Sequence, residues 1–144
     1  MLIRGSYLLK AKRKKVWKYL LKPKVLEKAI PGVRKIKKKG NTYKSKVDLS
    51  FGPFSGVYKG QFKIRKKKKP KSMLLDLKGS SKNNSITAEA KVRLTKTKEG
   101  TIVSYESEVD IGGILFFGNR IVNGIAKKIA SQFFISLAEQ LADD

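Results

Sequence analysis

The sequence predicts an α+β protein in which a strongly twisted antiparallel sheet packs against one long C-terminal helix. Apolar and polar residues alternate with period two through most of residues 1–111. Short turns separate these segments, and tight turns join antiparallel neighbours. After Gly112 the apolar period becomes that of a helix. The length of 144 residues, without a linker or internal repeat, indicates one domain over residues 1–144.

The elements follow in a simple order. Alternation over residues 3–9 predicts an opening strand, and helical spacing over residues 16–21 predicts a short helix. Pro23 suits the first residue of a second short helix, which Pro31-Gly32 ends. Alternation then predicts strands, separated by turns at 52–53, 65–70, 79–84 and 99–100, over residues 43–51, 54–64, 73–77, 86–94 and 103–111. An apolar stripe from Ile121 to Leu141 predicts the long helix.

The composition excludes several kinds of chemistry. The chain has no Cys and no His, so it has no disulfide, thiolate metal site, imidazole base or imidazole ligand. No phosphate-binding glycine loop or other catalytic motif is present, so we expect a protein that is not an enzyme and holds no metal or cofactor. A catalyst built from Tyr, Lys and carboxylates stays open.

The sequence also bears on location. No signal peptide and no apolar segment of about 18 residues is visible, which favours a cytoplasmic protein. Many Lys and no Cys fit the composition of a thermophile.

The inward surface of the predicted sheet mixes large and very small side chains. Small residues opposite a helix leave space, which neighbours fill or which stays open as a ligand cavity. Both interpretations remain open. The segment Gly112 to Gly118 brackets four apolar residues with glycines, and it is either a mobile lip over a pocket mouth or a turn leading into the helix.

The charge is strongly positive. There are 34 Lys+Arg and 11 Asp+Glu, a formal net charge of +23. Three clusters at 12–15, 34–39 and 65–71 would attract anionic lipid headgroups, an acidic protein or nucleic-acid phosphates. A solvated surface without a partner is the other interpretation. No nucleic-acid-binding motif is present, so nucleic acid is the less favoured partner.

Three acids, Glu106, Glu108 and Asp110, alternate along the last strand. Side chains about 7 Å apart on one strand do not converge on a cation. We expect cross-strand pairing with lysines instead of a metal site.

Several motifs resemble those of one family. The most specific are Ile30-Pro31-Gly32-Val33 and Phe51-Gly52-Pro53-Phe54-Ser55-Gly56, and the others are Gly5-Ser6, Val16-Trp17, Gly60, Gly100-Thr101, Ser104-Tyr105, Gly112-Gly113, Gly118-Asn119-Arg120 and Phe133-Phe134. Over nearly its whole length the chain resembles the CoxG family of carbon monoxide dehydrogenase subunits, which belongs to the START-like, helix-grip (SRPBCC) superfamily.

The resemblance implies a helix-grip fold: a seven-stranded antiparallel sheet around the C-terminal helix, with a hydrophobic cavity between them. It also implies a non-catalytic accessory role, linked to molybdenum hydroxylases of the carbon monoxide dehydrogenase type, to the membrane and to a lipophilic quinone. Some members continue into a hydrophobic membrane anchor, whereas this chain stops just after the helix, so we expect any membrane attachment to be peripheral, on the inner face of the membrane.

These observations lead to one hypothesis, a cavity that binds a quinone or lipid mainly by apolar burial. We expect it to be lined by Trp17, Phe51, Tyr58, Phe62, Met73, Tyr105, Phe117, Ile121 and Ile125. Tyr58 and Tyr105 would orient a polar group of the ligand. Access would be gated by Gly113, Phe116 and Phe117.

A basic surface would dock the protein on an anionic membrane or on an acidic partner such as a molybdenum hydroxylase. The residues expected there are Arg13, Lys14, Lys15, Lys37, Lys38, Lys66, Lys67 and Lys68. The alternatives are a nucleic-acid-binding protein and a cyclase-type enzyme acting in the same cavity.

Overall fold

The computed structural model describes residues 1–52, 54–113 and 118–143. Its elements are β1 (Leu2–Leu9), α1 (Arg13–Leu20), α2 (Pro23–Ala29), β2 (Lys37–Lys39), β3 (Thr42–Phe51), β4 (Phe54–Lys68), β5 (Ser72–Ser80), β6 (Asn84–Lys96), β7 (Thr101–Gly113) and α3 (Asn119–Ala142). The predicted fold class is confirmed: a seven-stranded antiparallel sheet, two short helices after the first strand and one long C-terminal helix.

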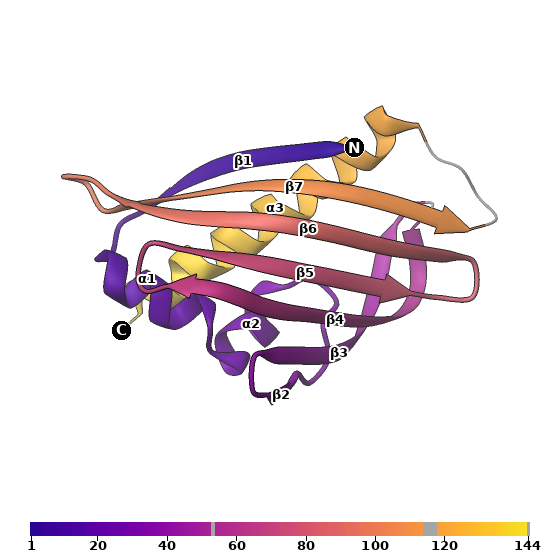
Figure 1. Ribbon diagram of the computed structural model, residues 1–144, viewed down its shortest axis with the longest axis horizontal. Coiled ribbons are helices and arrows are strands. Elements are labelled where there is room, and N and C mark those ends of the chain that lie inside the picture. Colours follow the sequence, from indigo (N-terminus) through magenta and orange to yellow (C-terminus); the bar gives the residue numbers. More distant parts are fainter. Residues whose placement is uncertain (53, 114–117, 144) are drawn as a thin grey trace.

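The strands lie in the order β1-β7-β6-β5-β4-β3-β2. The first strand, β1, is therefore an edge strand that pairs with the last strand, β7. Figure 1 shows the sheet curling around α3, which crosses behind it, with α1 and α2 at the end where β4 finishes. The long hairpins put every second residue on the face toward α3, because side chains alternate across a strand. We call this the inner face and the opposite one the outer face.

Compared with the sequence-based expectation, the sheet has one additional strand, and two of its connections are shorter. The edge strand β2 consists of three lysines that carry no alternation, and it forms because it pairs with Thr42–Lys44 of β3. Lysines on an edge strand also discourage pairing with another chain. The expected turn at 65–70 is shorter, since β4 continues to Lys68 through an irregularity at Lys66, whose φ is +50°. The expected loop at 79–84 is shorter too, because β5 runs to Ser80.

The hydrophobic core is divided into two clusters. The larger cluster lies between the sheet, α1, α2 and the C-terminal half of α3, and its most buried members include Leu9, Val16, Trp17, Val103 and Leu137. The rings of Tyr7 and Phe134 stack there with centroids 4.2 Å apart. The smaller cluster consists of Phe54, Tyr58 and Val122, and it lies near the N-terminal end of α3.

Candidate functional site

A hollow of about 240 Å³ lies on the inner face of the sheet, and we call it the inner cavity. Its lining joins the two core clusters: Tyr43 and Ile36 belong to the larger one and Tyr58 to the smaller one. The other lining side chains on the inner face are almost all apolar. The complete lining is Ile30, Val33, Ile36, Tyr43, Lys44, Ser45, Val47, Leu49, Tyr58, Gly60, Gln61, Phe62, Leu77, Lys78, Gly79 and Ile86.

The space exists because a row of small residues crosses the sheet. Ser45, Gly60, Gly79 and Ile86 are consecutive partners across β3, β4, β5 and β6. The first three place little or no side chain on the inner face. A Cβ built on Gly79 meets no atom within 4 Å, so the space beside it is open. The apolar residues around this row, such as Val47, Leu49 and Leu77, stay only partly buried.

The segment after α2 covers the cavity. Ile30, Val33 and Ile36 line it from this side, and Val33 forms an isolated bridge with Val47 of β3. The Arg34 guanidinium holds the segment at the sheet by donating to both carboxylate oxygens of Asp48, at 2.9 and 3.0 Å. This bidentate bond lowers the pKa of Asp48.

Two tyrosines bring hydroxyl groups to the cavity region. Tyr58 and Asn84 are both buried, and the Asn84 amide N–H donates to the Tyr58 hydroxyl at 2.9 Å. The Tyr58 hydroxyl lies 3.3 Å from the Asn84 amide oxygen, to which it can donate. Tyr43 donates to the backbone oxygen of Leu21 at 2.7 Å, and burial raises its pKa. Both hydroxyls therefore already have protein partners.

The expected lining residues fall in different places. Tyr58 and Phe62 line the inner cavity. Trp17 and Met73 are buried in the larger core cluster and are not among the lining residues. Ile125 packs against the smaller cluster, Ile121 is 51% exposed, and Phe51 lies under the Lys128 ammonium, 5.9 Å from its ring centroid. In the described part of the chain, the cavity is lined by the sheet and the segment after α2, not by α3.

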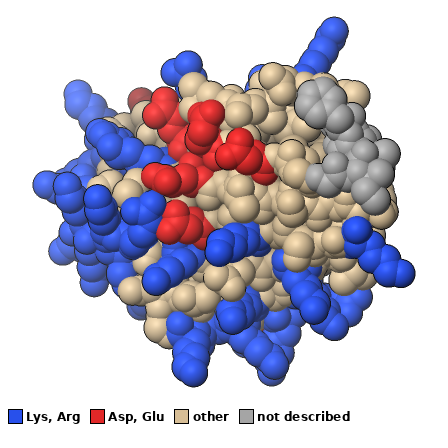
Figure 2. Space-filling model, turned by 45° about the vertical axis from the view of Figure 1, so that its right-hand side comes forward, with Lys and Arg blue, Asp and Glu red and all other residues tan. Residues whose placement is uncertain are grey.

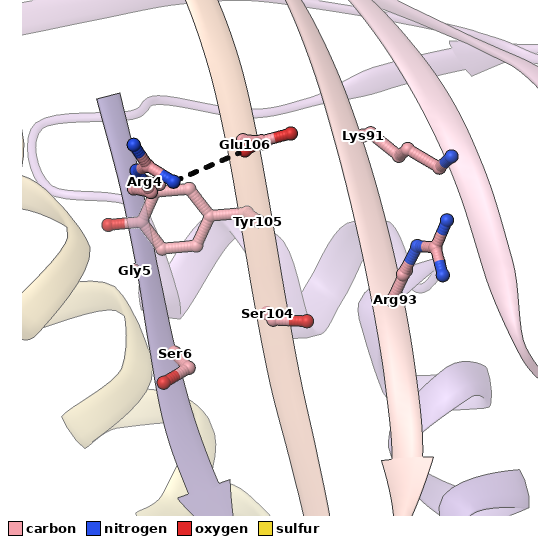
Figure 3. Close-up of a pocket in the computed structure, with 8 residues that line it drawn as sticks. All are labelled: Arg4, Gly5, Ser6, Lys91, Arg93, Ser104, Tyr105 and Glu106. Atoms are coloured by element: carbon pink, nitrogen blue, oxygen red, sulfur yellow. Dashed lines mark ion pairs between the residues drawn. The ribbon is translucent and has the colours of Figure 1, made fainter. Parts of the chain in front are cut away.

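Tyr105 lies on β7, next to the edge strand β1, and is not among the residues that line the inner cavity. Its ring stacks on Phe134 of α3, with centroids 6.3 Å apart, and it occupies the space that Gly5 leaves open across from it. Burial, and then the neighbouring Tyr7, raise the pKa of Tyr105. Figure 3 shows the shallow pocket of about 380 Å³ at this place, with the ion pair of Arg4 and Glu106 at its rim. Its other outward side chains are polar or charged, which does not suit a lipophilic ligand.

The expected gate is only partly described. Gly113 ends β7. Phe116 and Phe117 lie outside the described residues.

The expected basic docking residues lie on three elements. Arg13, Lys14 and Lys15 begin α1, Lys37 and Lys38 lie in β2, and Lys66, Lys67 and Lys68 end β4. Some of them also have structural contacts. The Lys15 ammonium donates to the Leu141 carbonyl at 3.0 Å, and Lys67 donates to the Asn41 side chain at 2.9 Å.

Sequence reasoning missed a second group of cations. Lys44, Lys46, Lys59 and Lys78 stand on the outer face of β3, β4 and β5, where with Arg34, Lys35 and Lys37 they line a groove of about 760 Å³. We call it the outer groove. In the sequence these lysines are isolated at alternate strand positions and form no basic run, so they do not stand out as a cluster.

In the described part of the chain, Glu106, Glu108 and Asp110 form no ion pair with a lysine, contrary to expectation. Glu106 contacts Arg4 at 3.8 Å, and Glu108 contacts the N-terminal ammonium at 3.3 Å. Arg65 pairs with both Asp76 and Glu89, at 2.6 and 3.4 Å. Arg65 binds Asp76 with two hydrogen bonds, because its planar fork matches both oxygens of a carboxylate. Figure 2 shows Asp and Glu gathered in one area of a largely basic surface.

Two properties of the described residues bear on location and metal binding. None of their helices combines the length and the apolar character needed to cross a bilayer. Among the same residues, no cluster of acidic side chains converges in a way that could hold a metal ion.

Comparison with known proteins identifies relatives. The family described as CoxG, a subunit of carbon monoxide dehydrogenase, matches residues 5–142. A conserved protein from Geobacillus kaustophilus has 27% identity and a TM-score of 0.94, covering 99% of this chain and 96% of that one. A START superfamily protein from Mycobacterium smegmatis has 10% identity and a TM-score of 0.76, with 99% and 97% covered. The latter shows the fold alone. No curated protein matches the sequence.

The buried Tyr58–Asn84 pair makes a testable contribution to stability. Tyr58→Phe leaves the Asn84 amide buried without this partner, so we expect the free energy of unfolding to fall by about 1–3 kcal/mol. The double variant Tyr58→Phe/Asn84→Leu removes both polar groups and is expected to regain much of this loss. Urea unfolding measures both effects. A single variant as stable as the unmodified protein would contradict the assignment.

Proposed function

Because the chain belongs to the CoxG family of carbon monoxide dehydrogenase subunits, we propose that it is a non-catalytic accessory protein that binds a lipophilic small molecule in the inner cavity. Family and START-like fold together suggest a ligand-binding accessory protein. The observation that carries the finer proposal is the open space beside Gly79, with apolar side chains around it. Apolar burial there contributes about 25 cal/mol per Å².

The size of the cavity restricts the ligand. Its volume of about 240 Å³ is below the usual range of about 300–1,000 Å³ for small-molecule pockets. A single quinone ring with a short side chain, or part of a lipid chain, suits this space better than a sterol or a large polyketide. We propose a quinone or lipid of this kind, with Tyr58 as the polar group nearest to it.

The cyclase alternative needs a free proton donor inside the cavity. The hydroxyls of Tyr58 and Tyr43 both have protein partners, which favours a binding role over turnover. We therefore propose that any enzyme activity belongs to a partner. A molybdenum hydroxylase of the carbon monoxide dehydrogenase type is the partner that the family favours.

We further propose that the basic residues of α1, β2 and the end of β4 dock the protein on an anionic membrane. Each Lys or Arg near such a surface contributes about 1 kcal/mol. Figure 1 places α1 and the end of β4 at the same end of the sheet, which supports a shared docking surface for the charges of these two elements.

Filling the cavity tests ligand binding. Gly79→Leu adds a side chain on the inner face where a Cβ has open space, so we expect the protein to fold with undiminished stability. Binding of a benzoquinone with one isoprene unit, or of lauric acid, should weaken by roughly tenfold or more, about 1.4 kcal/mol. Isothermal titration calorimetry measures the affinity.

The matched control is Ser80→Leu, which adds the same side chain one residue further on, on the outer face. It should leave binding unchanged. If neither probe binds the unmodified protein, or if both variants bind like it, the cavity is not the ligand site.

Vesicle flotation tests membrane docking. The protein should float with phosphatidylcholine vesicles that contain phosphatidylglycerol and stay behind with neutral ones. Lys14→Ala/Lys66→Ala/Lys68→Ala should lose about 1 kcal/mol of binding per lysine. The control Lys82→Ala/Lys91→Ala/Lys127→Ala has the same net charge and removes exposed lysines elsewhere, so it should lose less. Equal flotation on neutral vesicles would contradict docking by charge.

A further inference from the structure

The outer groove concentrates positive charge without a lining carboxylate. Seven of its described lining residues are cations, and none is Asp or Glu. The other lining side chains on the outer face are hydroxyls and an amide, those of Gln61, Ser80, Ser85 and Thr87. These groups and the ammonium groups can all donate hydrogen bonds, so the groove suits an anion that presents many oxygen acceptors.

The fold holds these cations close together at a cost. Lys46 stands directly opposite Lys59 across β3 and β4, and Lys37 stands opposite Lys44 across β2 and β3. Like charges directly opposite each other destabilise a sheet. In the described part of the chain, Lys44, Lys46 and Lys59 form no ion pair with a carboxylate. Among the acids of the same outer face, Asp48 pairs with Arg34 of the groove lining. The other ion pairs of this face involve Arg65, Arg4 and the N-terminus.

The donors form two parallel rows that cross the strands. One row runs Lys46, Lys59, Ser80, Ser85 and the other runs Lys37, Lys44, Gln61, Lys78, Thr87. Neighbours in a row are about 4.7–4.9 Å apart at the backbone, and the rows are separated by two residues, about 7 Å along a strand. An elongated anion lying across the strands would meet donors from both rows along its length.

The residue types in the lining also limit which anions suit the groove. No aromatic residue lines the outer groove in the described part of the chain. Proteins that bind single-stranded nucleic acid stack bases on aromatic side chains, so this groove offers nothing for a base. A volume of about 760 Å³ falls in the range of small-molecule sites. These observations favour a compact phosphate chain over a nucleic acid.

We propose that the outer groove binds a linear polyphosphate anion, held by the two rows of donors that cross the sheet from β2 to β6. The phosphate chain is the recognised group, whether it is free or is the triphosphate of a nucleotide. The site does not depend on the proposed function, since it lies on the opposite face of the sheet and shares only Lys37 with the docking residues.

Calorimetry of the full chain at about 0.1 M salt, with tripolyphosphate as the probe, tests this assignment. Lys46→Gln/Lys59→Gln should weaken binding by roughly tenfold or more. The control Lys14→Gln/Lys68→Gln has the same net charge and should change the affinity by less than about threefold. ATP and GTP should bind equally well if the phosphate chain alone is recognised. Free tripolyphosphate should bind at least as tightly as either nucleotide, which would show that the phosphates alone are sufficient.

Thermal unfolding gives an independent readout. Without anion, Lys46→Gln/Lys59→Gln should unfold at a higher temperature than the unmodified protein, because the repulsion between the two lysines is gone. Tripolyphosphate should raise the unfolding temperature of the unmodified protein and leave that of the variant nearly unchanged. A structural role of the lysines alone would not produce this difference.

Several results would overturn the proposal. Equal loss of affinity in both double variants would mean attraction by net charge only. Tighter binding of an oligothymidine that Lys46→Gln/Lys59→Gln abolishes would make the groove a nucleic-acid site. Tighter binding of phosphatidylglycerol vesicles that the same variant abolishes would make it a membrane surface. A strong preference between ATP and GTP would contradict recognition of the phosphate chain alone.

Discussion

The row of small residues across β3, β4 and β5 is the constraint on which the rest of the site depends. Ser45, Gly60 and Gly79 leave the middle of the curled sheet almost without side chains on its inner face. The two core clusters do not contact each other across this region, so they stay separate. Residues of both clusters line the inner cavity between them. Close packing elsewhere, around Trp17 and Leu137, supplies the stability that an unfilled space costs.

The same stretch of sheet also separates two chemically different hollows. Ser45, Gly60 and Gly79 line both the inner cavity and the outer groove. The inner side is apolar because its side chains face α3 and the segment after α2, whereas lysines crowd the outer side. Alternation along each strand produces this division, since residues next to one another in the sequence point to opposite faces. One thin wall can therefore serve an apolar ligand and an anion.

Much of this fold follows from the sequence, because period-two alternation assigns each strand residue to a face. It placed Tyr58, Gly60 and Phe62 on the inner face, and the change of period after Gly112 indicated α3. Alternation does not reveal β2, whose three lysines pair only because of the register of β3. It also does not extend to Gly79, which looks like the start of a polar loop although it completes the row of small residues.

The site was less predictable than the fold for a physical reason. Residue type indicates burial but not whether a buried side chain meets solid core or open space, and so Trp17 and Met73 were expected at the cavity. Likewise, runs of lysines are visible in a sequence, whereas Lys46 and Lys59 become neighbours only through strand pairing. Tertiary packing decides the first outcome and strand register the second, and no local sequence pattern carries either of them.

Native mass spectrometry of the protein purified from its own source, followed by extraction and identification of bound lipids, tests the central claim most directly. The account predicts one lipophilic molecule per chain, with a single ring or a short chain that fits about 240 Å³. A protein that carries no lipophile, and that takes up none from a panel of quinones and fatty acids, would contradict it.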